Sequence, residues 1–511
     1  NLIEDVPVLD AFAHDGFKVD RALNFLFYNQ DGIFGIMVNV LVTYVILFIF
    51  FGSFLKFSGA SKFFIDLPLA LAGKSVGGPA KVAVIASGFF GSVSGSAIAN
   101  TVSTGAFTIP MMKRAGFRPH VAGAIEPAAS IGGMFMPPIM GAGGFLMAEM
   151  TEIPYVDIMK MAIFPALMYF LSVFVMIHFE AKRYGLYGID DPDAPTAWDI
   201  LKKEWYLAAP LVIIVIMMLM GKSAGFSAVV AILSCIVVSW FTPDNKMGWR
   251  EIREAMIEGS RNTLIIGATV GVIGIIVGTI SLSGIGLKFS DIIISLSGGF
   301  LPAAILLIGI ASLVLGMGVP VTAAYLITAV LTVGSVSNMI AMQHFGMPLT
   351  DMEITRGMAE NVTWVMISSH MIVYWFSQDS NITPPVCVAA YAGAAIAGSD
   401  PWKTGWTSFK FAKFLYIGPF LFAYSRGFLL NGTPMEVIVT FTTIALATVA
   451  FGSVTMGYLS CGMNPLEWIL MAIATLILFF PDLGHVVLWF DAPGWSMDVA
   501  GILLWGTVFL L

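Results

Sequence analysis

Two apolar stretches of the chain are interrupted by clusters of small polar residues that could bind ions. The first stretch carries Gly91–Thr101 (GSVSGSAIANT) and Gly132–Ile139 (GGMFMPPI), and the second carries Gly316–Tyr325 (GMGVPVTAAY) and Asp379–Val386 (DSNITPPV). A helix that unwinds at such a cluster frees backbone carbonyls for a cation, and the next helix offers N–H groups to an anion. Neutral oxygen ligands suit sodium, whereas a proton needs a titratable group.

The candidate site residues come from these clusters. For cations, the candidate ligands are Ser92, Ser94, Gly95, Gly132, Gly133, Gly316, Gly318, Thr322, Ser380 and Thr383. For a carboxylate ligand, they are Ser96, Asn100, Thr101, Thr322, Asp379 and Asn381; of these, Ser96, Asn100, Thr322, Asp379 and Asn381 are also candidate cation ligands. No His/Cys cluster competes, which disfavours a transition metal. No HExxH or GxSxG motif suggests an intramembrane enzyme.

Ionisable residues inside apolar stretches are functional hypotheses by default. Asp379 stands at a helix break, where it is interpreted as an ion ligand, a proton carrier or a cap of the next helix. Glu126 precedes Pro127, and both a functional and a structural role stay open. His370 lies in a long helical run, which favours a core histidine with a satisfied hydrogen bond.

The elements that position these residues are membrane helices. The chain has 511 residues, of which 58% are hydrophobic and 11% charged, and its mean hydropathy is +0.88. Nine apolar stretches are long enough to suggest spans: Ile33–Phe51, Ile158–His178, Leu207–Met220, Phe226–Trp240, Leu264–Ile280, Leu415–Leu430, Val437–Phe451, Trp468–Phe480 and Ile502–Leu511. The net charge of −7 is spread through loops, and no nucleic-acid partner is expected. The sequence predicts an all-α polytopic membrane protein.

The distribution of Lys and Arg gives the orientation. The opening stretch Asn1–Asp31 is acidic, and Lys56 and Lys62 follow the first span. Because Lys and Arg gather on the cytoplasmic side, the chain is expected to start outside; 18 basic residues then fall inside and 7 outside. Ser61–Gly73 and Trp249–Ser260 are expected as amphipathic helices on the cytoplasmic surface, and Asp190–Pro195 as a polar linker.

The two interrupted stretches form an internal repeat. Ile85-Ala86-Ser87 matches Ile310-Ala311-Ser312 at an offset of 225, and Pro137-Pro138 matches Pro384-Pro385 at an offset of 247. The difference of 22 residues is expected as a longer loop around Ser337–Asp351. Each half is therefore predicted as a re-entrant hairpin followed by a broken helix. Close helix packing is the structural alternative for each Gly/Ser cluster.

The two halves are expected to be inverted. The flanks of the second hairpin, Asp291–Ala303 and Ser335–Asp351, carry no Lys or Arg, whereas those of the first carry Lys74, Lys81, Lys113, Arg114 and Arg118. The first hairpin should thus enter from the cytoplasm and the second from outside. Inverted repeats whose broken helices meet at the midplane are typical of secondary transporters.

These motifs resemble the large membrane subunit of the tripartite ATP-independent periplasmic (TRAP) transporters, particularly the fused permeases of the TAXI group. The similarity covers roughly residues 25 to 430 and is carried by Gly77–Gly116, Pro127–Glu149, Gly259–Lys288, Leu315–Tyr325 and Ser380–Gly405. The resemblance implies an elevator-type architecture in the bacterial or archaeal inner (cytoplasmic) membrane. A transport domain would slide against a scaffold and carry a small organic carboxylate, with Na⁺ or, as the alternative, a proton as the coupling ion.

The resemblance also implies partners and a domain order. The partners are a periplasmic substrate-binding protein that delivers the solute and small-subunit-like helices, which this sequence does not show, in a leading segment or a separate chain. The expected order is a periplasmic segment (1–32), a scaffold helix with an arm helix (33–76), the first transport-domain repeat (77–150), scaffold and arm helices (151–299), the second repeat (300–398) and C-terminal membrane helices (399–511).

Other functions remain possible at this point. A channel would need a continuous polar path, whereas matched hairpins favour alternating access. A sodium/carboxylate symporter that works without a binding protein is the alternative among transporters. Dicarboxylates such as 2-oxoglutarate and amino acids such as glutamate are candidate solutes.

The segment Asp379-Ser380-Asn381 departs from the Ser-Asp order that is common in the family loop, which shifts the acidic residue by one position.

Overall fold

The chain folds into helices throughout the part that the structure describes. This computed structural model describes residues 16–188, 195–241, 246–481 and 494–510. Over these residues no β-strand occurs, and Tyr458 and Gly462 form an isolated bridge. Five of the described helices are long and apolar enough to cross a membrane: Ile36–Phe57, Tyr155–Arg183, Trp249–Ser283, Val321–Phe345 and Pro434–Met456. The predicted all-α polytopic membrane fold is confirmed.

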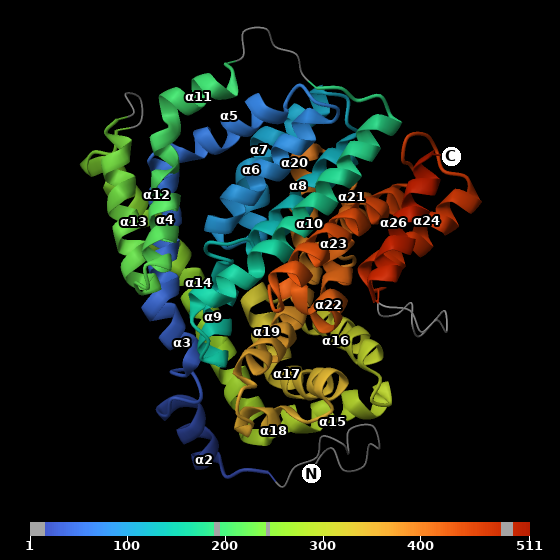
Figure 1. Ribbon diagram of the computed structural model, residues 1–511. Helices are drawn as coiled ribbons and strands as arrows, with labels where there is room; N and C mark the ends of the chain where they lie inside the picture. The colour runs from blue at the N-terminus through green and yellow to red at the C-terminus, as the bar shows by residue number, and fades with distance from the viewer. Residues whose placement is uncertain (1–15, 189–194, 242–245, 482–493, 511) are drawn as a thin grey trace.

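One group of helices, which we name the α4–α14 layer, lies on one side of the molecule (Figure 1). It consists of α3 (Ile36–Val40), η2 (Leu41–Val45), α4 (Ile46–Phe57), η3 (Trp205–Ala208), α12 (Ala209–Leu219), α13 (Ala224–Ser239) and α14 (Trp249–Ser283). Helices α13 and α14 both pack against α4. Lys56 of α4 and Glu258 of α14 form an ion pair of 2.9 Å.

The first interrupted stretch, residues 78–151, is a helix pair followed by a broken helix. Its helices are α6 (Gly78–Ser94), α7 (Ala97–Arg114), α8 (Pro119–Met134) and α9 (Gly141–Thr151). Helix α6 ends at Gly95, whose φ of 64° favours glycine, and Ser96 caps α7 by accepting a hydrogen bond from the N–H of Ala99. Helix α8 stops just before Pro137-Pro138, a cis bond without an N–H to continue the helix.

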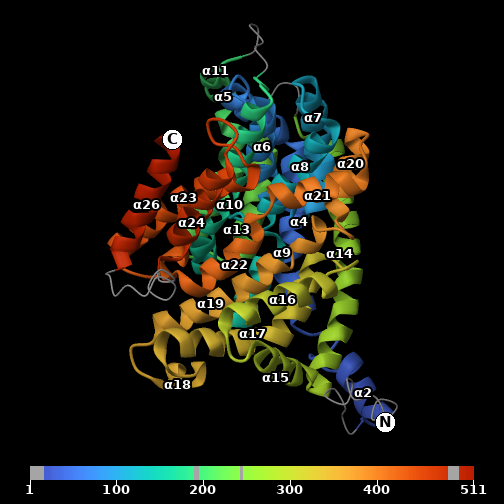
Figure 2. The same cartoon turned by 90° about the vertical axis from the view of Figure 1, so that its right-hand side faces the viewer.

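The second stretch, residues 301–397, repeats this order. It contains α16 (Leu301–Leu315), α17 (Val321–Phe345), α18 (Leu349–Ile354), α19 (Ala359–Phe376), η4 (Asp379–Asn381) and α20 (Val388–Ala397). Pro320 precedes α17, and Pro384-Pro385, also cis, lies between α19 and α20. In both views the α6–α7 pair lies in the upper half of the molecule and the α16–α17 pair in the lower half (Figures 1 and 2). The two pairs therefore approach the centre from opposite ends.

The two stretches pack directly on one another. Helix α20 of the second packs against α7 and α8 of the first. Glycines permit this approach, because a Cβ at Gly123 would lie 2.9 Å from the carbonyl oxygen of Gly393. Tyr374 of α19 reaches the break of the first stretch, where its hydroxyl lies 2.6 Å from the carbonyl oxygens of Met134 and Met140.

Further helices surround this centre. They are α10 (Tyr155–Arg183), α21 (Pro401–Phe411), α22 (Phe414–Tyr424), η5 (Arg426–Leu429), α23 (Pro434–Met456), α24 (Pro465–Phe479) and α26 (Gly494–Leu510). Helices α5 (Ala60–Ala72) and α11 (Ala197–Glu204) lie at the upper end, and α2 (Val19–Leu23), η1 (Asn24–Tyr28) and α15 (Ile285–Ser297) at the lower end (Figures 1 and 2).

The structure corrects three sequence expectations. Trp249–Ser260 is not a separate surface helix, because α14 runs without a break for 35 residues, about 52 Å at 1.5 Å per residue. Leu415–Leu430 is not a span: α22 has 11 residues, and Ser425 is extended. The extra residues of the second stretch, around Ser337–Asp351, are not a loop but the last turns of α17 and the start of α18.

Two expectations fall on residues that are not described. The first fifteen residues of the periplasmic segment 1–32 lie outside the described part of the chain. The same holds for the expected linker Asp190–Pro195, apart from Pro195 itself.

Candidate functional site

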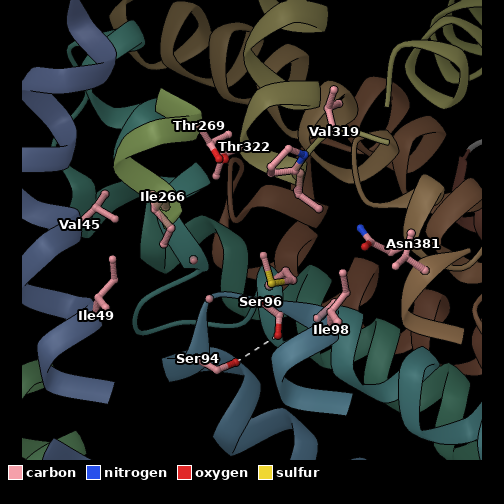
Figure 3. A pocket seen from close by; sticks show the side chains of 18 of the residues that line it. Val45, Ile49, Ser94, Ser96, Ile98, Ile266, Thr269, Val319, Thr322 and Asn381 are labelled. Carbon is pink, nitrogen blue, oxygen red and sulfur yellow. Dashed lines mark hydrogen bonds between the residues drawn. The ribbon is translucent and has the colours of Figure 1, made fainter. Parts of the chain in front are cut away.

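A cavity of about 460 Å³ lies where the tips of the two helix pairs meet the α4–α14 layer (Figure 3). Ser94 and Ser96 reach it from the α6–α7 tip, and Thr322 reaches it from the α16–α17 tip on the opposite side. Val45, Ile49 and other apolar side chains of the α4–α14 layer close a third side. Its volume is in the usual range for a small-molecule site.

Four helices begin at the wall of this cavity. Their first residues, all of which line it, are Ala97 of α7, Gly141 of α9, Val321 of α17 and Val388 of α20. The first N–H groups of a helix have no partner within the helix, and this end carries a partial positive charge. Among the described residues that line the cavity, none is charged. The partial positive charges at this cavity therefore come from the N-terminal peptide groups of these helices and not from side chains.

Helix C-termini reach the same cavity. Ser94 is the last residue of α6, Met134 is the last residue of α8, and Gly316 directly follows α16. The last carbonyl groups of a helix have no partner within it and carry a partial negative charge. With the hydroxyls of Ser94 and Ser380, they form an oxygen-rich wall that could hold a hard cation.

Two tyrosines, buried Tyr155 and partly exposed Tyr391, hold the broken helices in place. The Tyr155 hydroxyl lies 2.7 Å from the carbonyl oxygens of Pro138 and Ile139. In the second break, the Tyr391 hydroxyl donates to the carbonyl of Pro385 at 2.6 Å. Unwound backbone in an apolar interior needs such partners, because unpaired peptide groups are costly there.

The structure brings part of the predicted set together. The predicted residues that line the cavity are Ser94, Gly95, Ser96, Gly316, Gly318, Thr322, Ser380 and Asn381. They come from both tips and from the break between α19 and α20. Asn381 faces the cavity from the side opposite Val45 and Ile49 (Figure 3).

The remaining predicted residues of the first stretch lie outside the cavity lining. Asn100 donates to the carbonyl of Ser87 at 3.1 Å, and Ser92 donates to that of Phe89 at 2.8 Å. Thr101 is buried, and its hydroxyl has no hydrogen-bond partner among the described residues. Gly132 and Gly133 are packing residues in this structure: a Cβ at Gly132 would lie 2.6 Å from Phe170, and one at Gly133 would collide with the backbone of Gly91.

Asp379 and Thr383 lie behind the cavity wall. Asp379 is 1% exposed, and one of its carboxyl oxygens has no hydrogen-bond partner among the described residues. Its electrostatic neighbour is Tyr416 of α22, whose hydroxyl is hydrogen-bonded to the hydroxyl of Thr383. Ser380, the next residue, is the one that reaches the cavity.

Sequence reasoning missed one wall of the cavity and one buried polar side chain. The missed wall residues are Val45, Phe48, Ile49, Ile266 and Thr269 of the α4–α14 layer. They lie in apolar spans whose sequence does not distinguish a cavity-facing residue from a lipid-facing one. Gln378 was also missed: it is fully buried beside Asp379 in sequence, and neither of its amide atoms has a partner among the described residues.

Comparison with known proteins assigns the chain to a family. The family described as "Tripartite ATP-independent periplasmic transporter, DctM component" matches residues 17–433. A TRAP transporter large permease protein of Haemophilus influenzae is 26% identical over 225 residues, which cover 43% of this chain and 51% of that protein. The 2,3-diketo-L-gulonate TRAP transporter large permease protein of Escherichia coli is 28% identical over 169 residues, or 33% and 39% of the two chains. The matched segments thus span about half or less of these relatives.

Proposed function

The chain belongs to the DctM family of tripartite ATP-independent periplasmic transporters, and on this premise we propose that it carries out ion-coupled uptake of a small organic carboxylate. The main support for this proposal is the cavity, where four helices begin and none of the described lining residues is charged. A helix N-terminus stabilises a nearby anion by about 0.3–1 kcal/mol at a surface and up to ~2 kcal/mol where it is partly buried. Four of them favour a carboxylate without a basic side chain.

The solute class has further support. The Escherichia coli relative is named for 2,3-diketo-L-gulonate, which is itself a carboxylate. The cavity is large enough for a solute of that size and mostly apolar on the side of the α4–α14 layer. We propose a periplasmic substrate-binding protein as the donor of the solute, small-subunit-like helices as a second partner, and the inner membrane as the location.

The proposed coupling ion is Na⁺. Carbonyls at the ends of α6, α8 and α16 and the hydroxyls of Ser94, Ser96 and Ser380 are oxygen ligands of the kind that hard cations prefer. Thr322, in the first turn of α17, also faces the cavity. The described residues contain no group of three or more His, Cys, Asp or Glu side chains that could hold a metal ion.

The proposed movement is an elevator motion of residues 78–151 and 301–397 against the α4–α14 layer. The contact between them includes Gly52 of α4 and Val93 of α6, where a Cβ at Gly52 would lie 3.5 Å from a methyl carbon of Val93. A disulfide between Gly52→Cys and Val93→Cys should stop uptake, and reduction should restore it. Full uptake by the oxidised double variant would refute sliding at this contact.

The site itself is tested by adding charge. Thr322→Asp places a carboxylate in the first turn of α17, where it suits the helix but repels an anionic solute. Thr322→Asn is the uncharged control of the same size. We expect binding of carboxylates by the purified protein to be lost in Thr322→Asp and largely retained in Thr322→Asn. Equal affinity in both variants would show that the anion binds elsewhere.

A second pair of variants separates capping from ion binding. Ser96 and Ser223 are both N-caps whose hydroxyl lies 3.3 Å from the N–H three residues on, but only Ser96 lines the cavity. Each Ser→Ala change should cost about 1 kcal/mol of helix stability. Only Ser96→Ala should lower the apparent ion affinity of uptake; the same affinity in both variants would remove Ser96 from the ion site.

Uptake is measured in proteoliposomes under an imposed sodium or proton gradient, with and without the purified binding protein. Uptake that needs both the binding protein and a gradient supports the proposal. Equal uptake without the binding protein would instead identify a sodium/carboxylate symporter that works without one. Equal uptake without any gradient would refute ion coupling.

A further inference from the structure

A buried carboxyl group lies behind the cavity and is not used by the proposed transport mechanism. Glu126 of α8 is fully buried and does not line the cavity. Its carboxyl oxygens are hydrogen-bonded to the hydroxyls of Ser87 on α6 and of Thr104 and Thr108 on α7. Gly105 lets α7 come this close, because a Cβ there would lie 3.1 Å from Cγ of Glu126.

Within the described part of the chain, no cationic side chain balances this carboxyl. The groups that interact with it are the three hydroxyls. The charged or titratable residues of α8 and of the helices packed against it, α6, α7, α10, α20 and α21, have other contacts or positions. Lys81 contacts His178, Lys113 donates to the carbonyl of Ala397, and Tyr391 donates to that of Pro385. The Tyr155 hydroxyl lies against the carbonyls of Pro138 and Ile139, and the Tyr169 hydroxyl donates to that of Ala128. Glu180, Arg183 and Lys410 neighbour one another, and the others, at or near helix ends, are Asp157, Lys160, Lys182, Arg114, His120 and Lys403.

The three hydroxyls can serve either protonation state of Glu126. When the carboxyl is ionised, Ser87, Thr104 and Thr108 each donate their single hydrogen to it. When it is protonated, it needs an acceptor, and a threonine can accept from it by turning its own hydrogen elsewhere. Thr104 has the carbonyl of Asn100 at 2.7 Å and Thr108 has that of Thr104 at 3.1 Å as alternative acceptors. Every hydrogen therefore has a partner in both states.

A polar face of α7 runs from this cluster toward the cavity. Asn100, Thr104 and Thr108 are spaced four residues apart and so lie on one face of the helix, and Ser96, four residues before Asn100, is its N-cap. Ser96 lines the cavity at one end, and Thr108 contacts Glu126 at the other. Between them, Asn100 is fully buried, and its side-chain oxygen has no hydrogen-bond partner among the described residues.

We propose that Glu126 is a proton-binding site that is loaded and unloaded through the polar face of α7, so that a proton accompanies the solute. In the loading step, an O–H bond of a hydronium ion in the cavity breaks and leaves water, and the proton ends on a carboxyl oxygen of Glu126. The site itself is defined by buried side chains, but the pairing with a solute rests on the proposed transport function.

The proton site is tested first without transport. Infrared spectra of the full protein in lipid vesicles, recorded from alkaline to acid pH, should show a C=O band of a protonated carboxyl that appears reversibly. Glu126→Gln should remove this band, whereas Glu180→Gln and Asp379→Asn, which change other buried acids, should leave it. Thr108→Val should move the band to higher frequency, because the carboxyl loses a hydrogen bond. A titrating band that Glu126→Gln leaves intact would overturn the proposal.

Sodium is the competing occupant of the same oxygen atoms. If Glu126 held sodium instead, no titrating band would appear, and a sodium-dependent rise in melting temperature would be lost in Glu126→Gln. That combination would also overturn the proposal.

The coupling is tested in proteoliposomes with a pH gradient and equal sodium on both sides. The wild type should accumulate solute at least tenfold more than Glu126→Gln, while both exchange labelled for unlabelled solute. Accumulation driven by the pH gradient in Glu126→Gln would refute coupling through this residue. If the wild type carried no carboxylate but its band still titrated, the transport proposal would fail and the proton site would stand.

Discussion

The contact between α6 and α8 at Gly91 and Gly133 supports one prediction that can be worked out from distances. In Gly133→Ala, the new Cβ would collide with Cα of Gly91, and it would lie 2.6 Å from the carbonyl carbon of Gly91 and 3.1 Å from the N atom of Ser92. Carbon atoms prefer separations of about 3.5–4.0 Å. All three neighbours are backbone atoms, so a rotamer change cannot relieve the clash, and the helices must separate by about 1 Å.

The expected cost follows from overpacking. Extra atoms in a packed interior destabilise by about 1–3 kcal/mol, and this site is at the upper end because only backbone can move. The movement also carries a functional cost. Gly91 is three to five residues from Ser94 and Ser96, so displacing α6 displaces the cavity wall. Gly133→Ala should therefore lower both the melting temperature and the affinity for solute.

The chain contains its own reporter for the measurement. Cys235 and Cys387 are buried, whereas Cys461 is exposed. In a Cys461→Ser background, a thiol-reactive fluorophore should respond only when the protein unfolds on heating. Gly334→Ala is the matched control: Gly334 is also inside a helix, but a Cβ there meets no atom within 4 Å. It should be neutral or stabilise by about 0.5–1 kcal/mol. Equal melting temperatures and solute affinities for Gly133→Ala and Gly334→Ala would refute the reasoning.

Three further predictions concern other parts of the molecule. Burial raises the pKa of Asp66 on α5, outside the candidate spans. Because the folded state disfavours the ionised carboxylate, Asp66→Asn should raise the melting temperature at alkaline pH. This gain should disappear as the pH falls toward the pKa of about 3.9 that the group has in the unfolded chain. Tyr374→Phe removes the donor to the break between α8 and α9 and should cost about 1–3 kcal/mol in the same assay, with normal stability arguing against a role in holding the break. A double-mutant cycle on Lys56 and Glu258, both partly exposed, should give a coupling of about 1 kcal/mol or less, and a larger value would contradict the view that this pair is solvent-screened.

Much of the fold could be predicted because the membrane imposes a simple rule on the sequence. Every backbone group in the hydrocarbon must be paired, so apolar stretches become helices. Interruptions of these stretches indicate where unwound backbone is buried in protein or lines a cavity. Pro137-Pro138 and Pro384-Pro385 predict breaks between helices, and the structure has a break at each. The prediction of a span at Leu415–Leu430 is wrong because a helix buried in protein is as apolar as one that faces lipid. Only the short length of α22 distinguishes the two cases.

The candidate site was predicted only in part, for a related reason. Gly95 and Gly133 both lie in small-residue segments of the first stretch. Gly95 follows the end of α6 at the cavity, whereas Gly133 permits a close contact with the backbone of Gly91. The sequence does not separate these uses of glycine. The residues Val45 and Ile266 could not be chosen either, because the direction in which an apolar side chain faces depends on packing between segments far apart in the chain.

The proposed anion site is built from peptide groups, and this has an evolutionary consequence. Because the positive ends of α7, α9, α17 and α20 come from main-chain geometry, substitutions that preserve where these helices begin leave the field in the cavity intact. If the cavity binds anions as proposed, homologous carriers can diverge widely in amino-acid identity while keeping this preference, and a change of solute can arise from reshaping the apolar wall alone. Start points of helices, rather than matched side chains, are then the feature to compare when cargo is inferred across distant members.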